Sequence, residues 1–197
     1  MKKTDDQLTK TSRYLCYLLR HNPAAAGITL DSHGYADVQE LINAVSKTRP
    51  FDRKTLEHIV ATDEKGRYAF SDDKKMIRCV QGHSIPVDLE LEEKKPPAIL
   101  YHGSCTRFAE SIETYGLRSQ TRQYIHLSTD IKTAVNVGSR HGEPVVYEVD
   151  AAAMYQDGYQ FFLSANRIWL CKHIIPSSYL TRLAGNYVPD NTRKEEA

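Results

Sequence analysis

The chain has 197 residues, of which 41% are hydrophobic and 26% charged, and its formal net charge is +1. This length allows one large domain or two small ones, and the near-neutral charge argues against a protein that coats nucleic acid through many phosphates. No run of about eighteen apolar residues predicts a membrane span. The N-terminal residues lack the apolar segment of a secretory signal, so we expect a cytoplasmic protein, or a nuclear one in a eukaryote.

The first half of the sequence predicts three short helices followed by a β-hairpin. Leucines recur at helical spacing in the first helix, with Thr4 as its candidate cap, and Pro23 must end it near His21. Asp37 and Asp52 are candidate N-caps for the next two helices. This order is typical of a winged-helix-like lobe, which we place over residues 1–87. The predicted helices span 6–20, 38–47 and 53–62, and the hairpin strands span 67–70 and 76–82.

The second half predicts a mixed α/β lobe over residues 98–185. A charged stretch that ends in two prolines precedes it, so residues 88–97 are expected to be a linker. Short strands and helices follow without regular βαβ alternation. The polar tail, residues 186–197, is expected to be disordered. The predicted strands span 98–104, 123–128, 144–151, 160–165 and 167–175, and the predicted helices span 106–117 and 130–142.

The four cysteines, Cys16, Cys79, Cys105 and Cys171, are scattered in apolar surroundings. No pair has the spacing of metal ligands, and nothing in their positions requires a disulfide. We therefore expect reduced, inert core thiols in a reducing compartment, and no metal site.

Arg20 and His21 stand side by side where the first predicted helix ends. A cation at this end of a helix gains about 0.3 to 1 kcal/mol from the helix dipole, so helix capping is one interpretation. A phosphate-handling site is the other. The arginine fork binds phosphate through two parallel hydrogen bonds, and histidine titrates near neutral pH. These two residues alone leave both interpretations open.

Other candidate residues stand at the ends of predicted strands. Arg67 and Arg122 each precede a strand, where an arginine serves either a functional site or a solvated sheet edge. The second half offers side chains that could contact a ribose or a diphosphate, although Ser104 could instead cap the next helix, and Arg140 could be an ordinary surface residue. Neither a dinucleotide-binding glycine fingerprint nor a P-loop is present. These candidates are His102, Gly103, Ser104, His126, Ser128 and Arg140.

Together these segments resemble the RNA 2′-phosphotransferase family, enzymes that remove a 2′-phosphate from spliced tRNA with NAD. The resemblance spans about residues 11–180. It implies an α+β fold in which a winged-helix lobe is joined to an ADP-ribosyltransferase lobe. The segments that carry it are LRH, GITLDSHGYADVQEL, RYAF, IRCVQGHS, LYHGS, RQYIHLS, VGSRHG and the N-x-I-W-L run at 166–170.

The resemblance also implies the site residues. Its catalytic set falls on Arg20, His21, Arg67 and Arg122. The sequence departs from the family pattern in two places: Ser104 replaces the usual threonine, and Arg167 replaces the usual glycine, which bears on the local turn. The positions implied to contact NAD are His102, Gly103, Ser104, Gly116, His126, Ser128 and Arg140.

The implied reaction has two steps and uses NAD as a co-substrate. The RNA 2′-phosphate displaces nicotinamide, and a ribose hydroxyl then attacks the ADP-ribosylated phosphate. This releases RNA with a free 2′-hydroxyl and ADP-ribose 1″,2″-cyclic phosphate. The arginines would position the phosphate and stabilise charge on it, and His21 would assist proton transfer. The expected partners are 2′-phosphorylated RNA, with tRNA foremost, and NAD, and the expected state is a monomer.

Two alternatives remain at this point. One is an ADP-ribosyltransferase that modifies terminal phosphates of RNA or DNA with the same phosphate clamp. The other is a winged-helix regulator that senses NAD or ADP-ribose, although an Arg-His pair at a helix C-terminus is poorly placed for groove readout. Modification of protein side chains is not expected, because the late segment FLSANRIWLCKH contains no carboxylate.

Overall fold

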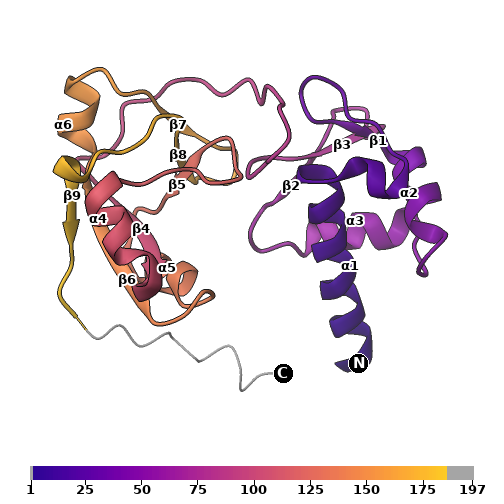
Figure 1. Ribbon diagram of the computed structural model, residues 1–197. Helices are drawn as coiled ribbons and strands as arrows, with labels where there is room; N and C mark the ends of the chain where they lie inside the picture. Colours follow the sequence, from indigo (N-terminus) through magenta and orange to yellow (C-terminus); the bar gives the residue numbers. More distant parts are fainter. Residues whose placement is uncertain (1, 186–197) are drawn as a thin grey trace. The chain divides into compact units, whose positions relative to one another are not determined.

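The computed structural model describes residues 2–185 and divides the chain into two compact units after Leu91. It has a mixed α+β fold with three small antiparallel sheets among the described residues (Figure 1). The division falls within the stretch 88–97 that the sequence predicts as a linker. The disorder predicted for 186–197 concerns residues outside the described part of the chain.

Three helices and a small sheet form the first unit. Asp37 and Asp52 are confirmed as N-caps, since their carboxylates accept hydrogen bonds from the backbone N–H groups of Glu40 and Thr55 at 2.8 Å. The first helix begins before Thr4, so the predicted cap at Thr4 is wrong. In chain order the elements are α1 (Lys2–Arg20), the 3-10 helix η1 (Pro23–Ala26), β1 (Ala36–Asp37), α2 (Val38–Ser46), α3 (Arg53–Ala61), β2 (Tyr68–Phe70) and β3 (Met76–Cys79).

The sheet of the first unit has the strand order β1-β3-β2. The predicted hairpin is confirmed as the antiparallel pair β2–β3, in which Ala69 lies opposite Arg78. Strand β1 has only two residues, too few for a periodic pattern, and the sequence did not reveal it. The apolar face of α1 packs into the core through Leu15, Leu18 and Leu19. Fully buried side chains from α2, α3 and β3 complete this core: Leu41, Val45, Leu56 and Ile77.

The second unit contains two sheets and three α-helices within its described residues. The predicted strands and helices are all present, most with shorter bounds and β4 shifted by one residue, and α6 and β9 are additional. In chain order the elements are β4 (Ile99–Cys105), η2 (Thr106–Phe108), α4 (Ala109–Tyr115), β5 (Ile125–Leu127), α5 (Ile131–Gly138), β6 (Pro144–Asp150), α6 (Ala151–Gln156), β7 (Phe161–Leu163), β8 (Trp169–Cys171), η3 (Ser177–Tyr179) and β9 (Leu180–Arg182).

The two sheets of this unit have the orders β4-β6-β9 and β5-β8-β7. They meet at an antiparallel bridge in which the backbones of Tyr101 and Ser128 exchange two hydrogen bonds of 2.8 Å. Helix α5 packs directly on β4, because a Cβ at Gly103 would overlap the carbonyl oxygen of Ala134, and one at Gly138 would overlap that of Ser104. This close approach fixes the part of β4 that carries the candidate residues.

The segment between the two units is bound at both ends. The backbone N–H of Asp88 donates to Ser32 O at 2.8 Å within the first unit. The N–H of Lys94 donates to Phe161 O at 2.8 Å within the second. Most of the predicted linker therefore belongs to one unit or the other.

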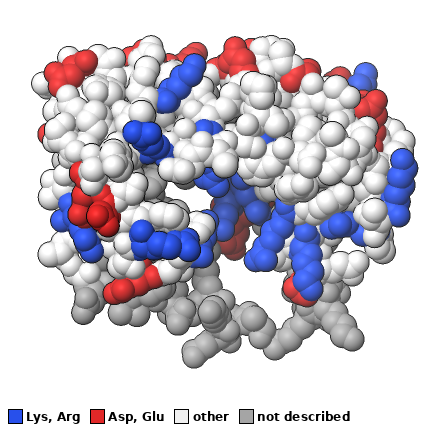
Figure 2. Space-filling view, viewed as in Figure 1, with Lys and Arg blue, Asp and Glu red and all other residues white. Residues whose placement is uncertain are grey.

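On the face shown in Figure 2, both acidic and basic side chains reach the surface. This mixture agrees with the near-zero net charge. Among the helices of the described residues, none is both long enough and apolar enough to cross a membrane.

Candidate active site

Arg20 and His21 lie at the C-terminal end of α1, where the sequence predicts the helix to stop. The Tyr17 carbonyl closes this end by accepting hydrogen bonds from the N–H groups of His21 and Asn22 at 3.0 and 3.1 Å. Pro23 follows and cannot continue the helix. The geometry thus projects two cation-capable side chains from one rigid point, in the field of the helix C-terminus.

The loop after β3 wraps around this helix end. The backbone N–H of Ser84 donates to Arg20 O at 3.0 Å, and the Ser84 hydroxyl lies 2.9 Å from His21 Nδ1. Gly82 has a φ of +90°, and a Cβ there would lie 3.4 Å from the Arg20 guanidinium. Glycine therefore both permits the left-handed turn and leaves room for the arginine side chain.

The Arg20 guanidinium has no carboxylate partner among the described residues. Its Nε and Nη2 atoms are buried and make no hydrogen bond to any described residue. These two nitrogens form the edge with which arginine grips a phosphate or a carboxylate through two parallel bonds. A buried, unpaired donor costs about 1 to 3 kcal/mol, so a bound acceptor, above all an anion, would stabilise this edge.

His83 lies next to this guanidinium and is only 1% exposed. Neither of its ring nitrogens has a hydrogen-bond partner among the described residues. Burial, together with the nearby positive charges of Arg20, His21 and Arg78, lowers the pKa of His83 to about 4. His83 is therefore neutral near pH 7 and adds no negative charge beside the Arg20 guanidinium.

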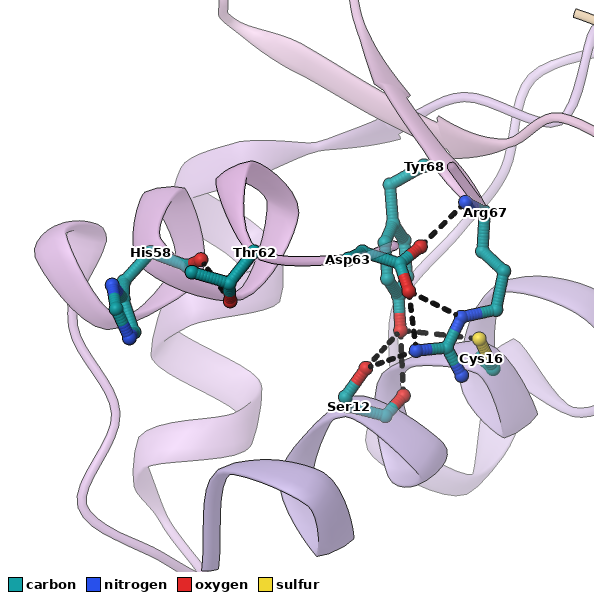
Figure 3. A network of polar contacts seen from close by, with 7 residues as sticks. All are labelled: Ser12, Cys16, His58, Thr62, Asp63, Arg67 and Tyr68. Carbon is teal, nitrogen blue, oxygen red and sulfur yellow. Dashed lines mark hydrogen bonds and ion pairs between the residues drawn. The ribbon is translucent and has the colours of Figure 1, made fainter. Parts of the chain in front are cut away.

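Arg67, by contrast, is held by protein groups (Figure 3). Asp63 Oδ1 accepts hydrogen bonds from Arg67 Nε at 2.8 Å and from Nη2 at 2.6 Å, and Nη2 also donates to Ser12 Oγ at 3.2 Å. The Tyr68 hydroxyl donates to Ser12 O at 2.6 Å and accepts from the Cys16 thiol at 3.1 Å. The network joins α1, the turn after α3, and β2.

The ion pair of Arg67 and Asp63 is nearly enclosed. Burial opposes both charges, but the hydrogen bonds between the two side chains outweigh it, so the pKa of Asp63 is lowered and that of Arg67 is raised. Both groups therefore stay charged at any physiological pH.

Two cysteines occupy the space near both arginines. The neighbouring Cys79 thiol is the largest influence that lowers the pKa of Cys16 to about 6, and the charges of Arg20 and Arg67 act in the same direction. Burial raises the pKa of the Cys79 thiol itself. The four cysteines are free, and their inertness stays a prediction.

In the second unit the structure brings together His102 on β4, His126 on β5 and Ser128 directly after β5. The His102 Nδ1 atom lies 3.1 Å from the carbonyl oxygen of His126. A carbonyl can only accept, so Nδ1 carries the proton. Burial lowers the pKa of His102, which keeps the ring neutral and leaves Nε2 as an acceptor. Such an acceptor suits a ribose hydroxyl.

The remaining predicted residues also lie in the second unit. Ser104 is buried on β4. Gly116 ends α4 with a φ of +77°, and a Cβ there would overlap the Ile175 carbonyl oxygen, so packing alone requires glycine. Arg122 and Arg140 are exposed, before β5 and after α5 respectively. Within the described residues no three or more His, Cys, Asp and Glu side chains gather as a metal site would require.

Sequence reasoning missed the groups that surround the arginines. Asp63 stands four residues before Arg67, a spacing that signals an ion pair only when the intervening turn is known. Ser12 is four residues before Cys16, which is four before Arg20, and this places all three on one face of α1. His83 and Ser84 belong to a quoted segment, IRCVQGHS, but nothing local indicates that this segment returns to α1.

Comparisons with known proteins agree with this chemistry. Residues 6–173 match the family described as "RNA 2'-phosphotransferase, Tpt1 / KptA family". A Fusobacterium nucleatum protein is 45% identical over 89% of this chain and 98% of its own length. An Agrobacterium fabrum protein is 47% identical over 88% and 93%, and one from Nostoc punctiforme is 45% identical over 91% and 99%. Each is named "Probable RNA 2'-phosphotransferase". The chain therefore belongs to the RNA 2′-phosphotransferase, Tpt1/KptA family, and is an enzyme of the transferase class.

Proposed function

We propose that this enzyme removes an internal 2′-phosphate from RNA, with tRNA as the foremost substrate, and uses NAD as the acceptor of the phosphoryl group. One observation carries the proposal: the phosphate-gripping edge of Arg20 is buried and unpaired among positive groups. A dianionic phosphate ester would satisfy those donors and neutralise that charge.

The proposal assigns the RNA phosphate to the first unit, through Arg20, His21 and Arg67. It assigns NAD to the second unit, where the His102 Nε2 acceptor fits a ribose hydroxyl. The further NAD contacts proposed there are Gly103, Ser104, Gly116, His126, Ser128 and Arg140.

In the first step a 2′-phosphate oxygen forms a bond to C1 of the ribose that carries nicotinamide. The bond from C1 to nicotinamide breaks, and its electron pair neutralises the charge of the ring. The phosphate is already an anion, so this step needs positioning and no general base. Arg20 and Arg67 would orient the phosphate oxygens.

In the second step the adjacent ribose hydroxyl attacks phosphorus, and the bond from phosphorus to the RNA 2′-oxygen breaks. The hydroxyl loses its proton, and the departing RNA oxygen gains one. His21, which is exposed and oriented by Ser84, would assist these transfers. Arg122 would stabilise the charge that builds on the phosphoryl oxygens.

The test uses the purified full chain, NAD and a short RNA with one internal 2′-phosphate. We expect one nicotinamide released for each 2′-phosphate lost, with ADP-ribose 1″,2″-cyclic phosphate as the product. Replacing Arg20 by alanine should lower kcat/KM by about 10²-fold or more. Arg20→Lys should not restore the rate, because an ammonium group cannot reproduce the two-bond grip.

Lys10→Ala is the matched control, since it removes an exposed cation from the same helix. It should keep the parental rate. A second RNA with the same sequence and only a terminal phosphate should not be turned over. If the second RNA instead accumulates ADP-ribose on its terminal phosphate, while the first RNA keeps its internal 2′-phosphate, the enzyme is a terminal-phosphate ADP-ribosyltransferase and the proposal is wrong.

A further inference from the structure

Arg67 and Arg20 differ in whether protein groups occupy the Nε and Nη2 edge of the guanidinium. The Nε and Nη2 atoms of Arg20 are unpaired. The same two atoms of Arg67 are bound to Asp63, at 2.8 and 2.6 Å. Arg67 therefore cannot offer the two-bond grip to a phosphate, and what it offers depends on how Asp63 holds it.

Asp63 binds Arg67 through the main chain as well as the side chain. Its Oδ2 atom accepts from the Arg67 backbone N–H at 2.5 Å, while Oδ1 takes the guanidinium. The intervening turn is tight, since the N–H of Gly66 donates to Asp63 O at 2.8 Å and Gly66 has a φ of +52°. One carboxylate thus fixes both ends of the arginine side chain.

The carboxylate is itself firmly placed. The Asp63 side chain is 3% exposed, whereas that of Arg67 is 25% exposed. Ser12 adds a third point of attachment, because its Oγ accepts from Nη2 at 3.2 Å and its carbonyl is bonded by Tyr68. The remaining nitrogen of the guanidinium, Nη1, makes no hydrogen bond to a described residue.

We propose that Asp63 is a positioning residue for catalysis, which holds the Arg67 guanidinium so that Nη1 is presented to the substrate phosphate, with Ser12 as its helper. This inference rests on the proposed function of Arg67. The negative charge of Asp63 weakens the attraction of Arg67 for a phosphate, so the benefit lies in orientation and not in affinity. Loss of Asp63 should consequently lower kcat and leave the KM for RNA unchanged or lower.

The experiment compares Asp63→Asn, Asp63→Ala and Ser12→Ala in the full chain, by nicotinamide release and RNA dephosphorylation. A misplacement of a positioned group by about 1 Å can cost up to about 10²-fold, so we expect Asp63→Ala to lower kcat about tenfold or more. Asp63→Asn keeps one acceptor and should lose less. Ser12→Ala should lower kcat by only a few fold, about the value of one hydrogen bond.

Asp52→Asn is the matched control, because Asp52 likewise binds a backbone N–H and a side chain in the first unit but does not contact Arg67. It should lower the melting temperature without changing kcat. A structural role of Asp63 would give the same pattern as this control. If Asp63→Ala fails to fold, Asp63→Asn and Ser12→Ala decide the question. The inference requires that both lower kcat while the KM for RNA stays unchanged or falls.

A double-mutant cycle separates orientation of Arg67 from other effects. In an Arg67→Ala background, measured under single turnover with enzyme in excess, Asp63→Asn should change the rate less than twofold. The inference is overturned if the Asp63 variants fold and keep the parental kcat. It is also overturned if the loss of rate that they cause adds in full to the loss caused by Arg67→Ala. Failure of the proposed function would look different, because the parent enzyme would then not release nicotinamide with 2′-phosphorylated RNA.

Discussion

His21 and Ser84 are joined by a 2.9 Å hydrogen bond across 63 positions of the sequence. The backbone N–H of Ser84 also donates to the carbonyl oxygen of Arg20, the residue before His21. The loop after β3 therefore sets the orientation of the imidazole and supports the end of α1 at the same time. The proton transfer proposed for His21 would benefit from a fixed ring, because the position of Nε2 is then defined.

Replacing Ser84 by alanine should disturb this orientation. One hydrogen bond contributes about 1 kcal/mol, so we expect kcat to fall about fivefold while the KM values for NAD and RNA change little. The check is steady-state kinetics with 2′-phosphorylated RNA. Ser46→Ala removes a serine on α2 that bonds only within its own helix, and it should leave kcat unchanged. Equal activity of Ser84→Ala and the parent would show that the bond has no catalytic role.

Replacing Arg122 by alanine should stall the second step of the proposed reaction. Without its charge, the phosphoryl oxygens lose stabilisation as the ribose hydroxyl attacks, so ADP-ribosylated RNA should accumulate. Gel separation of radiolabelled RNA would detect that species. Arg118→Ala, another exposed arginine on the segment that precedes β5, should behave as the parent. Clearance of the 2′-phosphate at the parental rate by Arg122→Ala would refute the role.

His83 should make the fold sensitive to acid. Its pKa of about 4 in the folded protein lies below its ordinary value of 6.5, so between these values the unfolded chain binds more protons. The contribution of His83 to the free energy of unfolding is thus fully present above about pH 6.5 and is lost as the pH drops toward 4. From pH 7 to 5 the loss attributable to His83 is about 2 kcal/mol.

Urea unfolding at pH 7 and pH 5 measures this loss. His83→Gln should be less stable than the parent at pH 7 but should lose less of its stability on acidification. His58→Gln, which changes an exposed histidine on α3, should keep the parental pH dependence. An unchanged pH dependence in His83→Gln would mean that His83 is not the group that titrates.

Arg167 occupies a backbone conformation that favours glycine. Its φ is +62°, in a turn where its N–H donates to Ser164 O at 2.8 Å. The left-handed region costs a residue with a Cβ about 1 kcal/mol, so Arg167→Gly should raise the free energy of unfolding by about that amount. Lys172→Gly, at an exposed position of ordinary φ, should lower it instead. A fall in the stability of Arg167→Gly would contradict this account.

Sequence reasoning left the turn at Arg167 open, because a pattern of residue types does not fix a backbone angle, and the structure gives this residue a left-handed conformation. The caps at Asp37 and Asp52 and the hairpin β2–β3 were predictable, since the signals are local and act within a few residues. Strand β1 and the cap at Thr4 show the limit of such signals at the ends of elements.

The surroundings of the candidate site could not be predicted from the sequence. The burial of the Arg20 fork depends on Gly82 and His83, which lie more than sixty positions away and return to α1 only because β3 pairs as it does. The ion pair between Arg67 and Asp63 depends on the tight turn between these two residues, in which Gly66 has a positive φ. These features depend on long-range packing and on which side chains pair with each arginine. A local pattern of residue types does not reveal either.

Helix α1 sets the spacing of three residues of the candidate site. Ser12, Cys16 and Arg20 follow one another at intervals of four, beside the face whose leucines are buried in the core. One inserted residue would turn everything beyond it by about 100°. An insertion or deletion between Ser12 and Arg20 would therefore change the direction of the Arg20 side chain relative to the buried leucines, and with it the register that the rest of the first unit is folded around.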